Sequence, residues 1–170
     1  MRLQAIELEY AHKAYSAIMP EVVMDSHEFT YYAGNSADLY MTNADDIQST
    51  PASSLNNSAA VNKFAMDTVS TKIHEDLAAA GLRNYHYGTT VNNPIGRAYY
   101  GLFNSISILI ETRGIGAGRQ NFPRRVFSQL VAVKSITETA ANNANTIRKM
   151  VADARKETIE KGAIYDLDDV

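Results

Sequence analysis

Two short polar stretches carry the residue types from which a hydrolytic site could be built. Asp25-Ser26-His27-Glu28 overlaps and follows the apolar run at residues 21–25, and Glu111-Thr112-Arg113 follows a second run at residues 105–110. An imidazole binds metal ions or transfers protons near neutral pH, and a carboxylate can serve as a general base. Asp25 and His27 are two residues apart, so they point to the same side of a strand, where Asp25 could orient the imidazole.

The elements that must position these groups can be predicted from periodicity and from turn residues. We expect an amphipathic helix over residues 2–18, a buried strand at 21–25, a helix over 59–80 ended by Gly81, a buried strand at 105–110 and a long helix over 123–160. Polar sequence at 34–58, with one short strand at 39–41, and turn-rich sequence at 82–101 are expected to form loops. Asn121 is the predicted N-cap of the long helix, with Pro123 in its first turn, and the acidic tail 166–170 is expected to fray.

Alternation of helices with buried strands indicates an α/β fold. The prediction is a three-layer α/β/α arrangement around a mixed, mostly parallel sheet, formed by residues 1–170 as a single domain. In such sheets ligands gather beyond the carboxyl ends of the strands, so His27 and Glu111 are expected to face one cleft. The alternative is structural: Asp25, His27 and Glu28 cap a strand, and Glu111 pairs with Arg113.

Composition narrows the classes of function. The 170 residues include 16 Lys and Arg against 19 Asp and Glu, for a net charge of −3, which lacks the basic excess typical of nucleic-acid binders. The absence of Cys excludes disulfides and thiolate metal sites. No apolar run approaches the roughly 20 residues that span a membrane, and residues 1–9 do not resemble a secretory signal peptide.

Two longer segments carry a family resemblance. Residues 20–30 (PEVVMDSHEFT) and 96–119 (GRAYYGLFNSISILIETRGIGAGR) resemble segments of the carboxypeptidase A-like zinc metallocarboxypeptidases, and the resemblance covers roughly residues 15–155. It implies that His27 is a ligand of Zn²⁺, that Glu111 is the catalytic general base, and that Asp25 and Arg113 support them. It also implies a peptide or protein C-terminus as substrate and a parent enzyme that is exported.

The chain departs from the family in one important way. The family's other two zinc ligands come as His-x-x-Glu upstream, and none of the four histidines here has Glu three residues later. The chain therefore resembles the C-terminal portion of a catalytic domain. A non-catalytic fragment that folds and self-associates is the alternative, because half of a sheet would expose a strand edge and an apolar face for a homo-oligomer to cover.

Further residues could line the cleft. Arg97 is a candidate contact for a substrate carboxylate, with a surface ion pair as the alternative, and Asn104 lies seven residues before Glu111. Four tyrosines are candidates to cover the substrate, with ordinary packing as the alternative: Tyr85, Tyr87, Tyr99 and Tyr100.

Three other motifs are weaker. Glu9-x-x-His12 occurs once, whereas carboxylate-bridged di-iron bundles need two copies. Gly114-x-Gly116-x-Gly118 lacks the surroundings of a dinucleotide loop, so a strand-to-helix turn is the simpler interpretation. His74 is expected to have no functional role on its helix.

Overall fold

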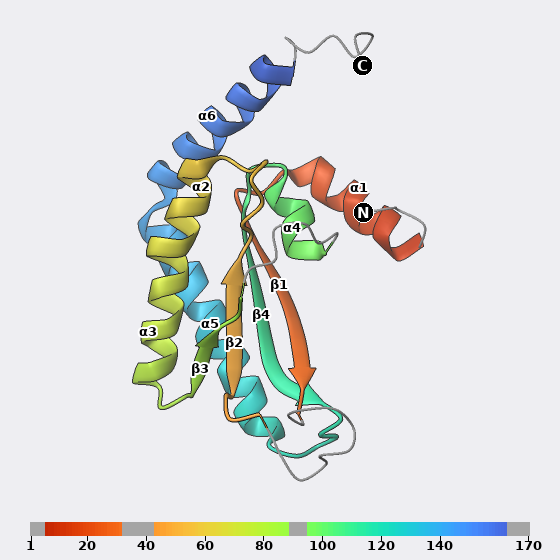
Figure 1. The fold of residues 1–170 in the computed structure, drawn as a ribbon, viewed down its shortest axis with the longest axis vertical. Coiled ribbons are helices and arrows are strands. Elements are labelled where there is room, and N and C mark those ends of the chain that lie inside the picture. Colours follow the sequence, from red (N-terminus) through yellow and green to blue (C-terminus); the bar gives the residue numbers. More distant parts are fainter. Residues whose placement is uncertain (1–5, 32–42, 89–94, 163–170) are drawn as a thin grey trace.

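A computed structural model describes residues 6–31, 43–88 and 95–162 of the chain (Figure 1). The helices are α1 (Ile6–Ile18), α2 (Ala59–Phe64), the π-helical segment η1 (Ala65–Ser70), α3 (Thr71–Ala79), α4 (Gly96–Gly101), α5 (Phe122–Asn142) and α6 (Ala144–Gly162). The strands are β1 (Val22–Thr30), β2 (Ile47–Pro51), β3 (Asn84–His86) and β4 (Ile106–Ile115).

The strands form one mixed sheet in the order β1-β4-β2-β3. β1 pairs in parallel with β4, β3 pairs in parallel with β2, and β2 joins β4 in the antiparallel direction. Helices lie on both faces of this sheet: α2, η1, α3, α5 and α6 share the main core on one face, and α4 contacts β1 and β4 on the other. The predicted α/β architecture with a mostly parallel sheet is confirmed.

The central strand β4 is held by an alternating row of isoleucines. Ile106, Ile108 and Ile110 are each 0% exposed and point to the face that carries the main core. Burying an isoleucine side chain stabilises a fold by about 1.5–3 kcal/mol, so this row is a large part of what fixes the sheet against the helices. The prediction of a buried strand here is confirmed.

The predicted helix over residues 59–80 is also confirmed, as the continuous run of α2, η1 and α3. Its apolar residues recur every four positions and are buried at every turn, with Val61, Val69 and Ile73 at 2%, 2% and 0% exposure. Gly81 follows the helix with φ of 71°, a conformation that L side chains rarely adopt.

Two polar regions that were predicted to be loops contain regular structure. β2 covers residues 47–51, where Ser49 and Thr50 are 1% and 0% exposed, and β3 and α4 lie within the turn-rich region. The loop prediction failed because neighbouring strands and helices bury these polar residues, and no apolar alternation marks them in the sequence. The short strand predicted at 39–41 lies outside the described residues.

Both strands that carry the candidate site are longer than predicted. β1 continues to Thr30 and β4 to Ile115, so His27 and Glu111 lie within strands rather than beyond their ends. β1 is also half-exposed rather than buried, because within the described chain it has a strand neighbour on one side only. An apolar sequence cannot reveal which of two similar strands will lie at an edge.

The predicted long helix is two helices, which meet at Asn143 between α5 and α6. Asn121 precedes α5 with φ of 53° and makes no side-chain cap hydrogen bond, while Pro123 lies at the helix start as predicted. Apolar periodicity predicts that Leu130, Ile136 and Ile147 lie on one inner face of this helix. Ile136 and Ile147 are buried, at 5% and 3% exposure, but Leu130 is 60% exposed. The tail 166–170 lies outside the described residues.

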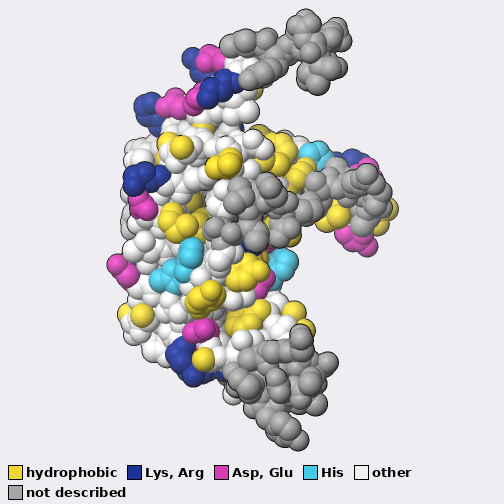
Figure 2. All heavy atoms as spheres, in the orientation of Figure 1, with side chains coloured by type: hydrophobic (Ala, Val, Ile, Leu, Met, Phe, Trp, Pro, Cys, Tyr) yellow, Lys and Arg dark blue, Asp and Glu magenta, His cyan; other side chains and the backbone are white. Residues whose placement is uncertain are grey.

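The helix α1 projects from the body of the protein (Figure 1). It confirms the helix predicted near the N-terminus, but not its apolar face, since Ile6 and Tyr10 are 63% and 64% exposed and only Tyr15 is buried. Within the residues described, no helix combines the length and apolarity needed to cross a membrane. Acidic and basic side chains alternate along the surface of α6 (Figure 2), where Lys149 pairs with Asp153 and Lys156 pairs with Glu160.

Candidate functional site

The sheet brings the two candidate polar stretches side by side. β1 and β4 run in parallel with His27 directly opposite Glu111, so both side chains leave the same face of adjacent strands about 4.8 Å apart. Asp25 lies two residues before His27 on this face, opposite Leu109. Glu28 lies on the other face, where its carboxylate accepts a hydrogen bond from Nε of Arg125 at 2.9 Å.

Asp25 holds the imidazole of His27. Nε2 of His27 lies 2.6 Å from Oδ1 of Asp25, and the two side chains are 53% and 20% exposed. The hydrogen bond occupies Nε2 and leaves Nδ1 as the ring nitrogen available to another partner. The start of α4 packs against the same carboxylate, because a Cβ built on Gly96 would lie 2.5 Å from Oδ2 of Asp25.

Glu111 is oriented by a residue that the sequence analysis missed. Nε2 of Gln48, on β2, donates a hydrogen bond of 2.6 Å to Oε2 of Glu111 and leaves Oε1 without a partner among the described residues. Gln48 lies in the region expected to be a loop. No local signal in the sequence distinguishes it, because its position opposite Glu111 depends on the β2–β4 register.

Arg97 follows Gly96, which packs against the carboxylate of Asp25. It is 3% exposed on α4, with its guanidinium carbon 5.5 Å from the ring centre of Tyr87. Burial lowers the pKa of Arg97 from its usual value, while Tyr87, Glu111 and Asp25 act in the opposite direction. The guanidinium therefore lies within electrostatic range of both carboxylates of the site.

Arg113 serves a different part of the fold. Its Nη2 lies 3.7 Å from Oδ1 of Asp46, it donates to the backbone carbonyl of Asn43, and it lies over the ring of Tyr31. The alternative Glu111–Arg113 ion pair is not formed in the described structure. Arg113 thus ties the end of β4 to the segment that leads into β2.

The remaining candidate residues, Tyr99, Tyr100 and Asn104, contact other parts of the fold or lie near Asp25. Tyr100 lies within electrostatic range of Asp25, and burial chiefly raises the pKa of Tyr100. Tyr99 hydrogen-bonds to Nδ1 of His12. Asn104 is 1% exposed and connects helices, since its Oδ1 accepts from the backbone N–H of Ser58 at 2.8 Å and its Nδ2 donates to Thr158 at 2.9 Å.

The histidines do not converge on a metal site. The imidazole of His74 bonds to Ser49, and Ser49 faces away from Glu111 because it is adjacent to Gln48 in the strand. His12 is held by Tyr99 on the side of α1, and Glu9 pairs with Lys13. Among the described residues no group of three His, Cys, Asp or Glu could hold a metal ion.

A zinc ion with three protein ligands therefore does not fit the described residues by themselves. They offer Nδ1 of His27 as a single nitrogen ligand on the face of Glu111. The other two ligands would have to come from outside the described parts of the chain.

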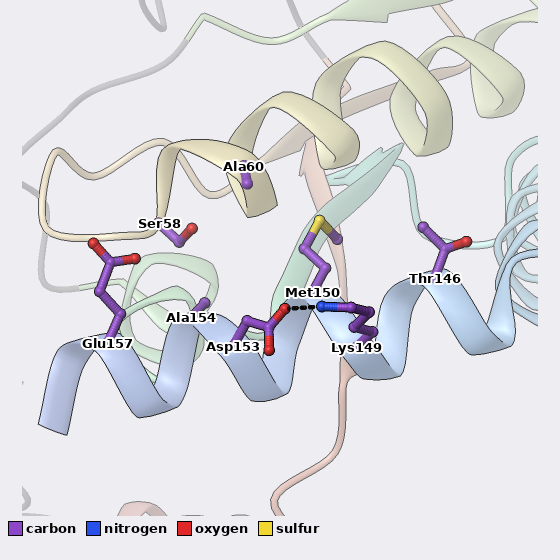
Figure 3. Close-up of a pocket in the computed structure, with 8 residues that line it drawn as sticks. All are labelled: Ser58, Ala60, Thr146, Lys149, Met150, Asp153, Ala154 and Glu157. Atoms are coloured by element: carbon purple, nitrogen blue, oxygen red, sulfur yellow. Dashed lines mark hydrogen bonds and ion pairs between the residues drawn. The ribbon is translucent and has the colours of Figure 1, made fainter. Parts of the chain in front are cut away.

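Two hollows on the surface do not include Glu111 among their lining residues. A groove of about 550 Å³ runs between β1 and α5, and its lining combines apolar residues such as Phe122 and Val126 with polar residues such as His27, Glu28 and Arg125. A second hollow of about 400 Å³ lies between α2 and α6 (Figure 3), where Lys149 and Asp153 pair with each other at 2.6 Å. Neither lies over Glu111.

Comparison with known proteins finds similarity to fungal carboxypeptidases. The chain is 30% identical over 162 residues to carboxypeptidase 2 of Trichophyton equinum, covering 87% of this chain and 29% of that protein. It is 30% identical to a probable carboxypeptidase 2 of Trichophyton verrucosum, with 87% of this chain and 30% of that protein covered. It is 29% identical to carboxypeptidase 2 of Trichophyton rubrum, with 87% of this chain and 29% of that protein covered. The chain thus spans less than a third of the length of these relatives. No model of a protein family matches the chain, and no solved structure matches it significantly.

Proposed function

We propose that this chain is the C-terminal part of the catalytic domain of a zinc carboxypeptidase and supplies one zinc ligand and the general base. The observation that carries the proposal is the register pairing of His27 with Glu111 on one face of the sheet. Similarity to proteins named carboxypeptidase 2 supports a role in peptide hydrolysis, with a peptide or protein C-terminus as substrate.

Glu111, Gln48 and Asp25 have different roles in this proposal. Glu111 takes a proton from the attacking water at Oε1 and later gives it to the leaving amine, while Gln48 keeps the other oxygen in place. Asp25 holds the ring of His27 with Nδ1 free for the metal. In complete sites of this type zinc lowers the pKa of bound water to about 7.

The test separates metal binding from proton transfer. Zinc uptake by the purified chain is measured by equilibrium dialysis, and hydrolysis by release of the last residue from N-blocked dipeptides. His27→Ala should reduce both, whereas Glu111→Gln should leave zinc uptake unchanged and lower hydrolysis by about 10²–10⁴-fold, the usual contribution of a general base. His86→Gln, which removes an imidazole from the opposite face, is the matched control.

Two outcomes would contradict the proposal. Zinc uptake that is equal in His27→Ala and wild type removes the ligand role of His27. Hydrolysis that Glu111→Gln does not reduce removes the general-base role of Glu111.

A second candidate function, self-association, is favoured by the exposed side of β1. In the described structure β1 has no strand neighbour beyond β4, and the adjacent part of α5 exposes Phe122, Val126 and Leu130 at 56%, 50% and 60%. Antiparallel pairing of two β1 strands centred on Ser26 would place Asp25 opposite His27 of the partner subunit. Such a pairing is self-complementary in charge and extends the sheet through a two-fold axis.

Light scattering coupled to size-exclusion chromatography tests this candidate. A dimer would have twice the chain mass of 18.7 kDa and would dissociate on dilution. Ser26→Pro, which removes a backbone donor from the free edge, should shift the equilibrium to the monomer. Ile159→Lys, at a 72% exposed position of α6, should not. A wild-type monomer at every concentration rules the candidate out.

A further inference from the structure

One tripeptide in the chain has the pattern of an acceptor for an N-linked glycan. Asn56-Asn57-Ser58 matches Asn-x-Ser/Thr with a middle residue other than proline, and no other asparagine of the chain has Ser or Thr two positions later. A pattern this short needs support from its place in the fold. Because a glycan is bulky and solvated, its asparagine must lie outside the core.

The structure places this tripeptide at the surface, in the turn between β2 and α2. Asn56 is exposed, and its neighbour Leu55 is 90% exposed. Asn57, by contrast, is 7% exposed, and its Nδ2 donates a hydrogen bond of 3.3 Å to Oδ1 of Asn62. Of the two adjacent asparagines, the exposed one is therefore the one that begins the acceptor pattern.

The turn keeps its shape without the two side chains that the modification requires. The backbone N–H of Asn57 donates to the carbonyl of Ser54 at 3.1 Å, and that of Asn56 donates to Oγ of Ser54 at 3.2 Å. The backbone N–H of Ser58 donates to Oδ1 of Asn104 at 2.8 Å. In the described structure neither the amide group of Asn56 nor the hydroxyl of Ser58 makes a hydrogen bond, so both are available.

The surface beside Asn56 leaves room for a sugar. Asn56 lines a third hollow, of about 560 Å³, between this turn and α6, together with Leu55 and Glu157. Neither His27 nor Glu111 lines this hollow. A glycan at this position would therefore lie next to the exposed side chain of Leu55 and away from the residues of the candidate site.

We propose that Asn56 carries an N-linked oligosaccharide when the protein passes through a eukaryotic secretory pathway. The similar carboxypeptidases come from fungi, which glycosylate proteins that enter this pathway. In the transfer, Nδ2 of Asn56 bonds to the anomeric carbon of an oligosaccharide, and the bond from that carbon to the diphosphate of a lipid carrier breaks. The lipid diphosphate leaves, one amide proton passes to a base of the transferase, and nothing is oxidised or reduced.

Secretion of the full chain from a yeast, behind a cleavable secretion leader, tests this proposal. The mass of the secreted protein is measured before and after treatment with peptide-N-glycosidase F. Wild type should exceed the chain mass of 18.7 kDa and should return to it after treatment, with Asn56 converted to Asp. Tandem mass spectrometry of the peptide that contains residue 56 locates that conversion. None of these readouts depends on zinc or on hydrolysis.

Variants test whether the tripeptide is responsible. Asn56→Gln and Ser58→Ala should each abolish the mass difference, whereas Ser58→Thr should retain it because Thr also completes the pattern. Asn145→Gln is the matched control, since Asn145 is an exposed asparagine of α6 that has Ile two positions later. It should be glycosylated as wild type is. Cell-free translation with microsomes reports attachment for any variant that fails to fold.

Three outcomes would overturn the proposal. The first is a secreted wild-type protein that carries no glycan. The second is a glycan that persists in Asn56→Gln or in Ser58→Ala. The third is a midpoint of urea unfolding that rises when the glycan is removed from the folded protein, because a glycan at an exposed turn should leave the midpoint unchanged or higher. Loss of hydrolysis in Glu111→Gln would have no bearing on any of them.

Discussion

Replacing Asp46 by Asn tests whether one buried carboxylate stabilises the packing of β2 and β4 against α5. The side chain of Asp46 is 3% exposed and accepts hydrogen bonds of 2.8 and 2.7 Å from Arg124 and one of 2.9 Å from the backbone N–H of Arg83. Arg113, on the strand of Glu111, lies 3.7 Å away. The network joins β2, β4 and α5 at one end of the site.

The size of the loss follows from these contacts. Breaking a buried ion pair typically costs about 3–5 kcal/mol, but Arg124 and Arg83 are 46% and 59% exposed, so water screens part of the attraction. Asn also retains one acceptor oxygen. We therefore expect Asp46→Asn to lower the free energy of unfolding by about 2–3 kcal/mol at pH 7.

The pH dependence gives the sharper test. Burial alone would raise the pKa of Asp46, but the hydrogen bonds from Arg124 and from the Arg83 backbone outweigh it and lower the pKa below the usual value. Because the pKa is depressed in the folded state, the stabilisation is complete above the unfolded pKa of about 3.9 and is lost as the pH falls through the folded value. The difference between Asp46→Asn and wild type should therefore shrink below about pH 4.

Urea unfolding followed by circular dichroism at pH 7 and near pH 3 measures both effects. Asp153→Asn is the control, because Asp153 and Lys149 form an exposed pair and should contribute under about 1 kcal/mol. A loss below 1 kcal/mol for Asp46→Asn at pH 7, or a loss that is the same at both pH values, would refute the reasoning.

Three further changes probe the core, the site and a strained turn. Ile108→Ala should cost about 2–5 kcal/mol in urea unfolding, whereas Ile6→Ala, at a 63% exposed position, should cost under about 0.5 kcal/mol; equal losses would contradict the assigned core. Gly96→Ala should displace the Asp25 carboxylate, which an NMR shift of the His27 ring would reveal, and an unchanged ring signal would argue against that packing. Asn104→Ala should lower the unfolding free energy by about 2 kcal/mol, through lost hydrogen bonds and a φ of 58° that Ala tolerates poorly, and a thermal melt unchanged from wild type would count against it.

The sequence predicted those helices and strands whose buried residues are also apolar and regularly spaced. The strand around Ile108 and the helix around Ile73 were predicted correctly, because each has an apolar pattern that a local rule can recognise. β2 was not, because Ser49 and Thr50 are polar and are buried only by their neighbours in the sheet. The break at Asn143 also carries no Gly or Pro to mark it.

The candidate site divides in the same way. Strand alternation alone places Asp25 and His27 on one face, and their hydrogen bond is a local consequence. The role of Gln48 depends on a distant strand pairing and was missed. Arg97 and Tyr87 were both recognised as candidates, but the burial of Arg97 and its contact with the ring of Tyr87 could not be deduced from their neighbours in sequence.

The sequence by itself determined that this is an α/β chain with two strands that lead to His27 and Glu111, because hydrophobic periodicity and residue type are local properties. It also showed that the chain lacks a His-x-x-Glu pair. Only the tertiary structure decided that His27 lies directly opposite Glu111, that β1 is at the edge of the sheet formed by the described residues, and that Arg97 is buried. Those facts depend on strand order and register, which are set by burial of the whole sheet against its helices rather than by any single segment.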